Sequence, residues 1–227
     1  GRELTIATMQ KIAAMITDKY RQKGYVTSRA YLPPQRIKDG VLIIRVVEGK
    51  MGSLQINGNK HFSTPLLQRM IDVQPDGYFD YTALQESLIY INEHPDRNAK
   101  AVLVPGSEPG TTDIVIEVED HLPIHFGFEY DNYASKYLNQ DRYALFAEHN
   151  NLLGFDDKLF YRAQVGEGDK LFVQQGNYTV PVNRKLNLGG YFLLSKIRLG
   201  RDFAELESRG KARLYGFYGN YMLLQEE

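Results

Sequence analysis

The fold class is decided by the stretch Ile124-His125-Phe126-Gly127-Phe128-Glu129-Tyr130-Asp131. Its apolar and polar side chains alternate, and successive residues of a β-strand point to opposite faces of a sheet. One face therefore carries Ile124, Phe126, Phe128 and Tyr130, and the other carries His125, Glu129 and Asp131. The alternation predicts a strand that separates an apolar environment from a polar one.

Similar patterns continue toward the C-terminus and predict about six antiparallel strands of roughly ten residues each, the length of tilted transmembrane strands. The connections at 150–157 and 181–184 look short, whereas the polar segment 198–210 is longer. That asymmetry is typical of outer-membrane barrels. A soluble all-β sandwich or barrel would alternate in the same way. The density of Tyr and Phe favours the membrane only slightly, so the pattern alone leaves both open.

The first 122 residues have a different, mixed α and β pattern. Apolar residues recur at helical spacing in the segments 6–16, 64–71 and 81–92. Strand-like runs lie at Tyr25–Leu32, Val41–Val47, Leu54–Ile56, Ala99–Val104 and Thr112–Val118, with a turn at Asp39-Gly40. The order β-α-α-β-β in 50–122 follows a truncated α-β-β copy in 1–49, which indicates a weak internal repeat.

Composition excludes several classes of protein. The 227 residues contain 27 Lys and Arg against 28 Asp and Glu, so the net charge is −1. This balance gives no support to a nucleic-acid binder. The chain has no Cys, which excludes disulfides, thiolate metal sites and cysteine nucleophiles. Of its 27 Tyr and Phe residues, 19 follow Leu122, which indicates a boundary between two kinds of structure. The chain lacks an initiator Met, so we expect a mature or excised piece.

The polar residues offer few candidates for chemistry. His125, Glu129 and Asp131 share a strand face and could form an acid/base pair or a metal site, but a polar stripe facing a barrel lumen is the favoured interpretation. Asp156-Asp157 is interpreted as a turn. Gly166–Asp169 is interpreted as a hairpin turn, because no helix follows it as a phosphate loop requires. No catalytic, cofactor or metal site is predicted.

An exposed strand edge is the stronger functional hypothesis. A β-α-α-β-β sheet leaves at least one edge open, and such an edge can accept an extended peptide as an added strand. The candidate residues lie on two strands and are Tyr25, Val26, Thr27, Arg29, Tyr31, Ala99, Ala101 and Leu103. Alternatively, these side chains simply fill domain cores.

An ordered set of short motifs resembles one family. The segments 24–35, 39–42 and 47–49 resemble the first POTRA domain of outer-membrane two-partner-secretion transporters (the TpsB family, haemolysin/haemagglutinin secretion-activation proteins). Asn57-Gly58-Asn59 resembles the start of the second POTRA domain. The segments 128–133, 149–157 and 178–182 resemble the first barrel hairpins.

The resemblance implies three segments: the end of the first POTRA domain (1–49), the second POTRA domain (50–122) and the first six or so strands of a transmembrane barrel (123–227). The family's barrel has sixteen strands, so the barrel is incomplete here and the chain is expected to be part of a larger protein.

The resemblance implies a Gram-negative outer-membrane location with periplasmic POTRA domains, outer-membrane lipid around the barrel, and no enzymatic activity, nucleotide or metal. Ile124, Phe126, Phe128 and Tyr130 would face lipid, and His125, Glu129 and Asp131 the lumen. The implied partner is a large secreted passenger with an N-terminal secretion domain. Alternatives are a barrel-assembly factor of the same superfamily and a soluble periplasmic binding or scaffold module.

Overall fold

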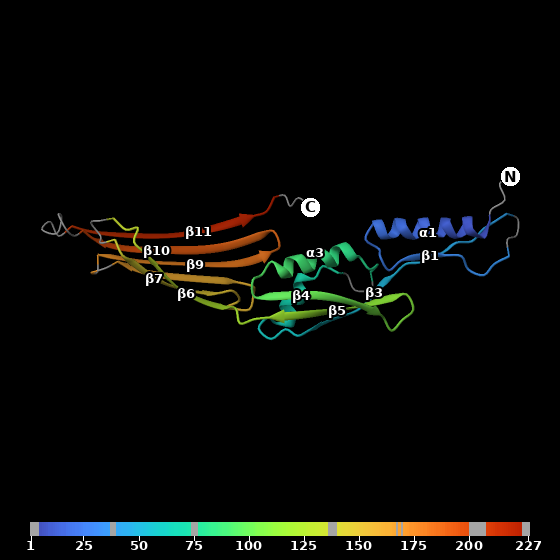
Figure 1. Ribbon diagram of the computed structural model, residues 1–227, viewed down its shortest axis with the longest axis horizontal. Helices are drawn as coiled ribbons and strands as arrows, with labels where there is room; N and C mark the ends of the chain where they lie inside the picture. The colour runs from blue at the N-terminus through green and yellow to red at the C-terminus, as the bar shows by residue number, and fades with distance from the viewer. Residues whose placement is uncertain are drawn as a thin grey trace. The chain divides into compact units, whose positions relative to one another are not determined.

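A computed structural model describes residues 5–36, 40–73, 77–135, 140–166, 168, 170–199 and 208–223. The chain divides into two compact units, Gly1–Asp120 (unit 1) and His121–Glu227 (unit 2), which are described separately (Figure 1). The finer division at residues 49 and 122 stays a prediction. Parts of three predicted connections, at Asp39, at Glu167 and Asp169, and at 200–207, lie outside the described residues.

The first part of unit 1 consists of helix α1 (Ile6–Gln22) and a two-stranded sheet of β1 (Arg29–Tyr31) and β2 (Arg45–Val47). Thr5 caps α1, because its side chain accepts a hydrogen bond from the Thr8 amide at 3.3 Å. This α-β-β order is the one predicted from the sequence.

Both strands are shorter than the sequence predicted. In place of a strand beginning at Tyr25, the chain turns, and the Ser28 amide donates to the Tyr25 carbonyl at 3.1 Å. The predicted strand Val41–Val47 is limited to its last three residues. The Gln35 side-chain amide bonds both backbone groups of Ile43, at 2.9 and 2.7 Å, and so takes the place of a neighbouring strand.

The second part of unit 1 has the predicted β-α-α-β-β order. Its elements are β3 (Lys50–Asn57), α2 (Thr64–Met70), α3 (Tyr81–Asn92), β4 (Arg97–Pro105) and β5 (Thr111–Asp120). The sheet order is β3-β5-β4, with β3 parallel and β4 antiparallel to the central β5. The core between sheet and helices contains Phe62, Leu67, Phe79, Leu84, Ile91, Ile114 and Ile116, each at most 1% exposed.

One buried carboxylate holds the loop that follows β3. Asp120, at the end of β5, accepts hydrogen bonds from the amides of Lys60, His61 and Phe62 at 2.9 to 3.1 Å. These amides lie outside the strands and helices, so the carboxylate provides the acceptors that a regular element would otherwise supply.

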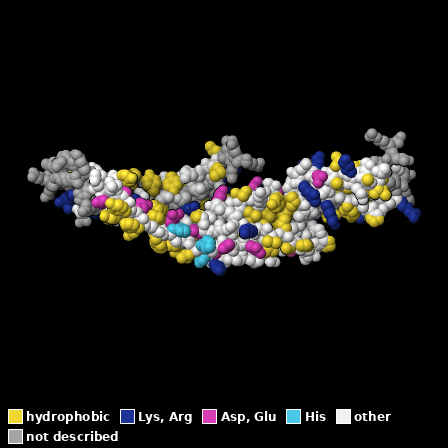
Figure 2. All heavy atoms as spheres, viewed as in Figure 1, with side chains coloured by type: hydrophobic (Ala, Val, Ile, Leu, Met, Phe, Trp, Pro, Cys, Tyr) yellow, Lys and Arg dark blue, Asp and Glu magenta, His cyan; other side chains and the backbone are white. Residues whose placement is uncertain are grey.

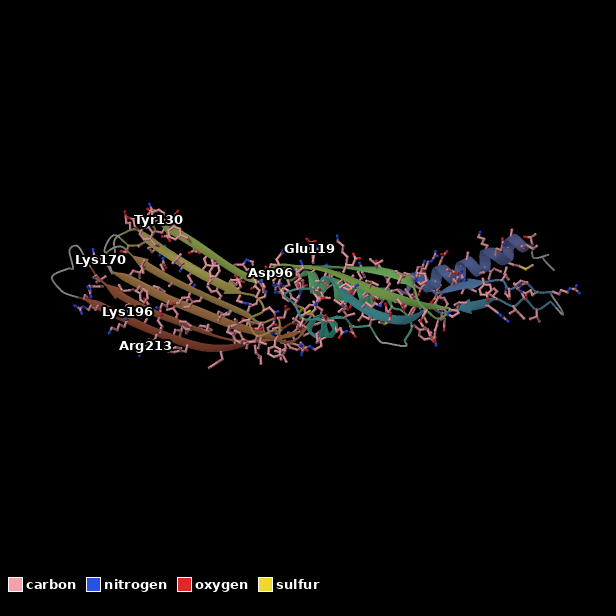
Figure 3. All side chains as sticks on the ribbon, turned by 90° about the horizontal axis from the view of Figure 1, so that it is seen from below. Asp96, Glu119, Tyr130, Lys170, Lys196 and Arg213 are labelled. Atoms are coloured by element: carbon pink, nitrogen blue, oxygen red, sulfur yellow. The ribbon has the colours of Figure 1, made fainter. Side chains whose placement is uncertain are left out.

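Unit 2 is an antiparallel meander of six strands, as predicted. The strands are β6 (Ile124–Asp131), β7 (Arg142–His149), β8 (Lys158–Gly166), β9 (Leu171–Asn183), β10 (Leu186–Arg198) and β11 (Arg209–Tyr221). Each strand pairs with the next in the chain, so β6 and β11 form the two edges of the described sheet. The sheet resembles part of a barrel wall and is not closed among these residues (Figure 3). No helix in the described part of the chain is long and apolar enough to span a bilayer.

Replacing Asp120 tests the role of the buried carboxylate. We expect Asp120→Ala to lower the free energy of unfolding of unit 1 by roughly 2 kcal/mol, because three loop amides, of which that of Phe62 is buried, lose their acceptor. Urea-dependent hydrogen exchange measures this value for unit 1 alone. The neighbouring Glu119 is exposed. Glu119→Ala is the matched control, and an equal loss in both variants would contradict the assignment.

Candidate functional site: a free strand edge and a two-faced sheet

Strand β4 forms an outer edge of the unit 1 sheet, since in the described part of the chain it pairs only with β5. At Ala99 this edge is occupied by a side chain. The Ala99 amide donates to Asn92 Oδ1 at 2.6 Å, and Asn92 Nδ2 donates to the Ala99 carbonyl at 3.0 Å. The backbone groups of Ala99 therefore point away from β5, and the amide of Asn92 imitates one residue of a neighbouring strand.

The open part of this edge is two residues long. In an antiparallel ladder, alternate residues direct both backbone groups toward the partner strand. Because the backbone groups of Ala99 point away from β5, those of Ala101 and Leu103 do so as well. The Gly106 amide, by contrast, donates to the Thr111 carbonyl on the β5 side at 3.0 Å. Pro105 has no N–H to offer. The edge available to an added strand thus consists of the N–H and C=O groups of Ala101 and Leu103.

The side chains of the three predicted β4 residues point into the domain. Ala99 is 3% exposed, and Ala101 and Leu103 pack against the same core. The exposed side chains of β4 near the open edge are Lys100, Val102 and Val104. A peptide added here would therefore meet the backbone of Ala101 and Leu103 rather than their side chains.

The predicted residues of the first part do not form a comparable edge. Tyr25, Val26 and Thr27 lie in the turn before β1, and only Arg29 and Tyr31 lie on that strand. The outward backbone of Ala30 between them is occupied, because its amide donates to Thr17 Oγ1 of α1 at 2.9 Å. Tyr25 instead packs edge-on against Tyr20 and Tyr78.

This aromatic contact belongs to the junction between the two parts of unit 1. Tyr20 donates to Glu48 at 2.8 Å, and Tyr78 also hydrogen-bonds Glu48. The bond to Glu48 is the main cause that raises the pKa of Tyr20 and the pKa of Tyr78 above the ordinary value. Two backbone bonds join the same parts: Phe79 N to Gly49 O at 2.9 Å and Tyr81 N to Gly24 O at 3.0 Å. No pattern in the sequence indicates this junction.

In unit 2 the strand register extends the predicted apolar face across all six strands. Residues directly paired across an antiparallel sheet share a face. Phe128 pairs with Leu145, Leu145 with Ala163, and Phe192 with Tyr215. Phe126, Phe128 and Phe217 are 78%, 64% and 94% exposed, respectively. Figure 2 shows hydrophobic side chains gathered along this sheet. We call this side, which includes Ile124 and Tyr130, the apolar face.

The opposite side, the polar face, carries His125, Glu129 and Asp131. Asp131 bonds Arg142 of the neighbouring strand at 2.6 Å. Glu129 bonds Arg162 of β8 at 2.7 Å, across β7, where Ala144 is 3% exposed. The predicted acidic residues are therefore paired with arginines. In the described residues no three His, Asp or Glu side chains are grouped as metal ligands.

The predicted turn at Asp156-Asp157 is built around a buried carboxylate. Asp157 is fully buried and accepts hydrogen bonds from the amides of Leu153 and Phe155 at 3.0 and 3.2 Å. Asp156 adopts a φ of 65°. The carboxylate of Asp157 therefore stabilises the β7–β8 connection. This structural role accounts for the pair Asp156-Asp157 as a turn, and no bound ligand is needed to explain it.

Comparison with known proteins agrees with this architecture. The model of the ShlB-type POTRA domain matches residues 1–49, and the model described as haemolysin secretion/activation protein ShlB/FhaC/HecB matches residues 110–227. A POTRA-like unit followed by strands of an antiparallel barrel defines the class of POTRA-containing outer-membrane barrels. Within that class, the chain belongs to the haemolysin secretion/activation protein family.

Individual relatives are similar over most of the chain. The heme/hemopexin transporter protein HuxB of Haemophilus influenzae (strain 86-028NP) is 25% identical over 96% of the chain and 39% of its own length. The outer membrane transporter CdiB of Dickeya dadantii is 25% identical over 83% of the chain and 34% of its own. This chain thus spans well under half of these relatives.

Solved structures share the fold. CdiB from Escherichia coli superposes with a TM-score of 0.74 at 19% identity, over 98% of this chain and 42% of that one. BamA from Haemophilus ducreyi gives a TM-score of 0.62 at 13% identity, over 96% and 42%. These similarities confirm the predicted fold class.

The tyrosine–glutamate junction predicts a pH dependence. A raised pKa in the folded state means that the contribution to stability is present below about pH 10, the ordinary tyrosine value, and is lost as pH rises through the raised pKa. We expect Glu48→Gln to lower the pKa of both tyrosines toward the ordinary value. Difference titration of ultraviolet phenolate absorbance measures the change. Glu93→Gln, which removes an exposed carboxylate at the end of α3, is the control and should leave the titration unchanged.

Proposed function

We propose that this chain is part of an outer-membrane transporter that binds a large secreted passenger protein through periplasmic POTRA domains and exports it through its barrel. We infer that it lies in the outer membrane of a Gram-negative bacterium, contacts outer-membrane lipid, and binds no nucleic acid. It is not an enzyme and requires no nucleotide, metal or other cofactor in this proposal. Folding of the passenger outside the cell would supply the driving force.

The observation that carries the proposal is the separation of the unit 2 sheet into an apolar and a polar face. Each exposed phenylalanine side chain costs about 2 kcal/mol in water relative to burial, and a continuous apolar face repeats that cost across the sheet. A monomeric soluble protein seldom exposes so large a patch. Lipid covers such a face without cost, while the Asp131–Arg142 and Glu129–Arg162 pairs suit a water-filled lumen.

The open edge of β4 supports the passenger-binding step. An unfolded passenger is extended, and two outward-facing residues, Ala101 and Leu103, offer four backbone groups to it. Backbone pairing is tolerant of sequence, which suits a receptor for a long chain. The passenger contacts predicted for Tyr25, Val26, Thr27, Arg29 and Tyr31 stay a proposal. The strand edge there offers fewer backbone groups than β4, because it is one residue long and that residue, Ala30, already bonds Thr17.

The assembly-factor alternative is favoured by one observation, the fold similarity to BamA. Fold alone does not separate the two functions. The match of the secretion/activation family model over residues 110–227 supports export instead. HuxB and CdiB are both named as transporters.

Proline at the open edge tests passenger binding. In the full-length protein, Ala101→Pro removes an outward N–H and places a ring on the edge, while the ladder to β5 keeps its bonds. We expect the affinity for the N-terminal secretion domain of the passenger to fall at least about tenfold, measured by isothermal titration calorimetry in detergent. Ala101→Gly, which keeps the N–H, is the matched control and should bind normally.

A second variant predicts the opposite change. Asn92→Ala frees both backbone groups of Ala99 and lengthens the open edge, so the affinity should rise. Equal affinities for wild type, Ala101→Pro and Asn92→Ala would show that β4 is not the binding edge.

A further inference from the structure

The β7–β8 connection, residues 150–157, exposes three large apolar side chains that the function proposed above does not use. Leu152, Leu153 and Phe155 are 45%, 62% and 52% exposed, respectively. The β9–β10 connection lies at the same end of the antiparallel meander and carries the polar pair Arg184-Lys185 instead. An apolar tip is therefore a particular feature of the β7–β8 connection and not a general property of this end of the sheet.

The strand register places the base of this connection on the apolar face. His149 pairs with Ile124 on one side and with Leu159 on the other, and Leu159 pairs in turn with Tyr178. Since directly paired residues share a face, all four belong to the apolar face. Asp157 lies two residues before Leu159 and therefore points to the same side of the sheet.

Polar side chains at this base accept hydrogen bonds from the backbone of the connection. The Asn151 amide donates to His149 Nδ1 at 3.2 Å. The amides of Leu153 and Phe155 donate to the Asp157 carboxylate at 3.0 and 3.2 Å. Because both acceptors lie on the apolar face, the connection folds back over that face and presents its apolar side chains on the same side of the sheet.

These hydrogen bonds lower the cost of moving the connection out of water. Asp157 is fully buried, and its carboxylate also bonds the hydroxyl group of Tyr178. The Asp156 amide donates to Asn151 Oδ1 at 3.0 Å. A carboxylate or an N–H group without a partner is costly away from water, and these groups have partners within the connection or beside it. The apolar side chains can therefore leave water while these polar groups stay paired.

The level of the connection in a membrane follows from its place in the sheet. The Asn150 amide donates to the Pro123 carbonyl just before β6 at 2.8 Å, so the connection lies at the end where the meander begins. Unit 1 precedes this point in the chain, and if unit 1 is periplasmic, the connection lies at the periplasmic leaflet. Irregular backbone does not face lipid within the hydrocarbon core, so the boundary between headgroups and acyl chains is the level that suits it.

We propose that Leu152, Leu153 and Phe155 insert into the periplasmic leaflet at the boundary between headgroups and acyl chains, and so anchor this end of the sheet to lipid. This inference rests on the outer-membrane location proposed above. Lipid is favoured over a protein partner because the connection continues directly from the apolar face. In addition, residues 150–155 include no charged side chain that could orient a protein partner.

The experiment uses the full-length protein in phosphatidylcholine vesicles whose acyl chains carry bromine, which quenches tryptophan fluorescence at short range. One set of vesicles carries bromine near the headgroups, and a second set carries it near the chain ends. Phe155→Trp and Leu152→Trp report on the connection, after the emission of the wild type is subtracted. The matched control is Ile89→Trp on α3, because Ile89 is 54% exposed and belongs to unit 1.

We expect bromine near the headgroups to quench both connection variants at least about threefold more than Ile89→Trp, because an interfacial side chain enters about 5–10 Å beyond the headgroup boundary. Bromine near the chain ends should quench Phe155→Trp and Leu152→Trp less than bromine near the headgroups. Quenching at either connection site that is no greater than in the control would overturn the proposal. Stronger quenching from the chain ends would also overturn it, because it would place the connection in the hydrocarbon core.

Heat-dependent mobility on gels separates failure of this inference from failure of the proposed function. A variant that lacks the mobility shift of the wild type has not folded, and Leu153→Trp then takes its place. A wild-type protein without any shift would contradict the barrel. Quenching of Phe155→Trp in that protein would still support contact between the connection and lipid.

Discussion

The N–H and C=O groups at every strand edge need hydrogen-bond partners, and the rest of this structure depends on that constraint. A buried or membrane-embedded N–H without an acceptor costs more than most single contacts supply. In unit 1, side chains occupy part of two strand edges: Thr17 bonds the backbone of Ala30 on β1, and Asn92 bonds the backbone of Ala99 on β4. In unit 2 each inner strand pairs with a neighbour on both sides, and only β6 and β11 remain as edges of the described sheet.

The same constraint explains which parts of the fold could be predicted from sequence. The alternation in Ile124–Asp131 is a local property of the sequence that separates an apolar from a polar face, so the strand and the residues on each face were predicted correctly. The run Val41–Val47 has equally strong β propensity. Most of this run is not a strand, because the side-chain amide of Gln35 hydrogen-bonds the N–H and C=O of Ile43. Such a contact cannot be predicted from the local sequence pattern.

The candidate site was predictable in part for the same reason. An open edge follows from the β-α-α-β-β order, and strand Ala99–Val104 was found. Which backbone groups of β4 point outward depends on the Asn92–Ala99 contact, and that contact became visible only in three dimensions.

The function proposed above explains why the open edge of β4 is short. Long open edges invite uncontrolled pairing, so a receptor that binds by strand addition must keep its edge short. Asn92 and Pro105 limit the edge of β4 to Ala101 and Leu103. Four backbone groups bind a peptide only weakly, since each hydrogen bond contributes about 1 kcal/mol net. Weak binding suits the proposed transporter, because a passenger that is bound tightly at the entrance would not move on.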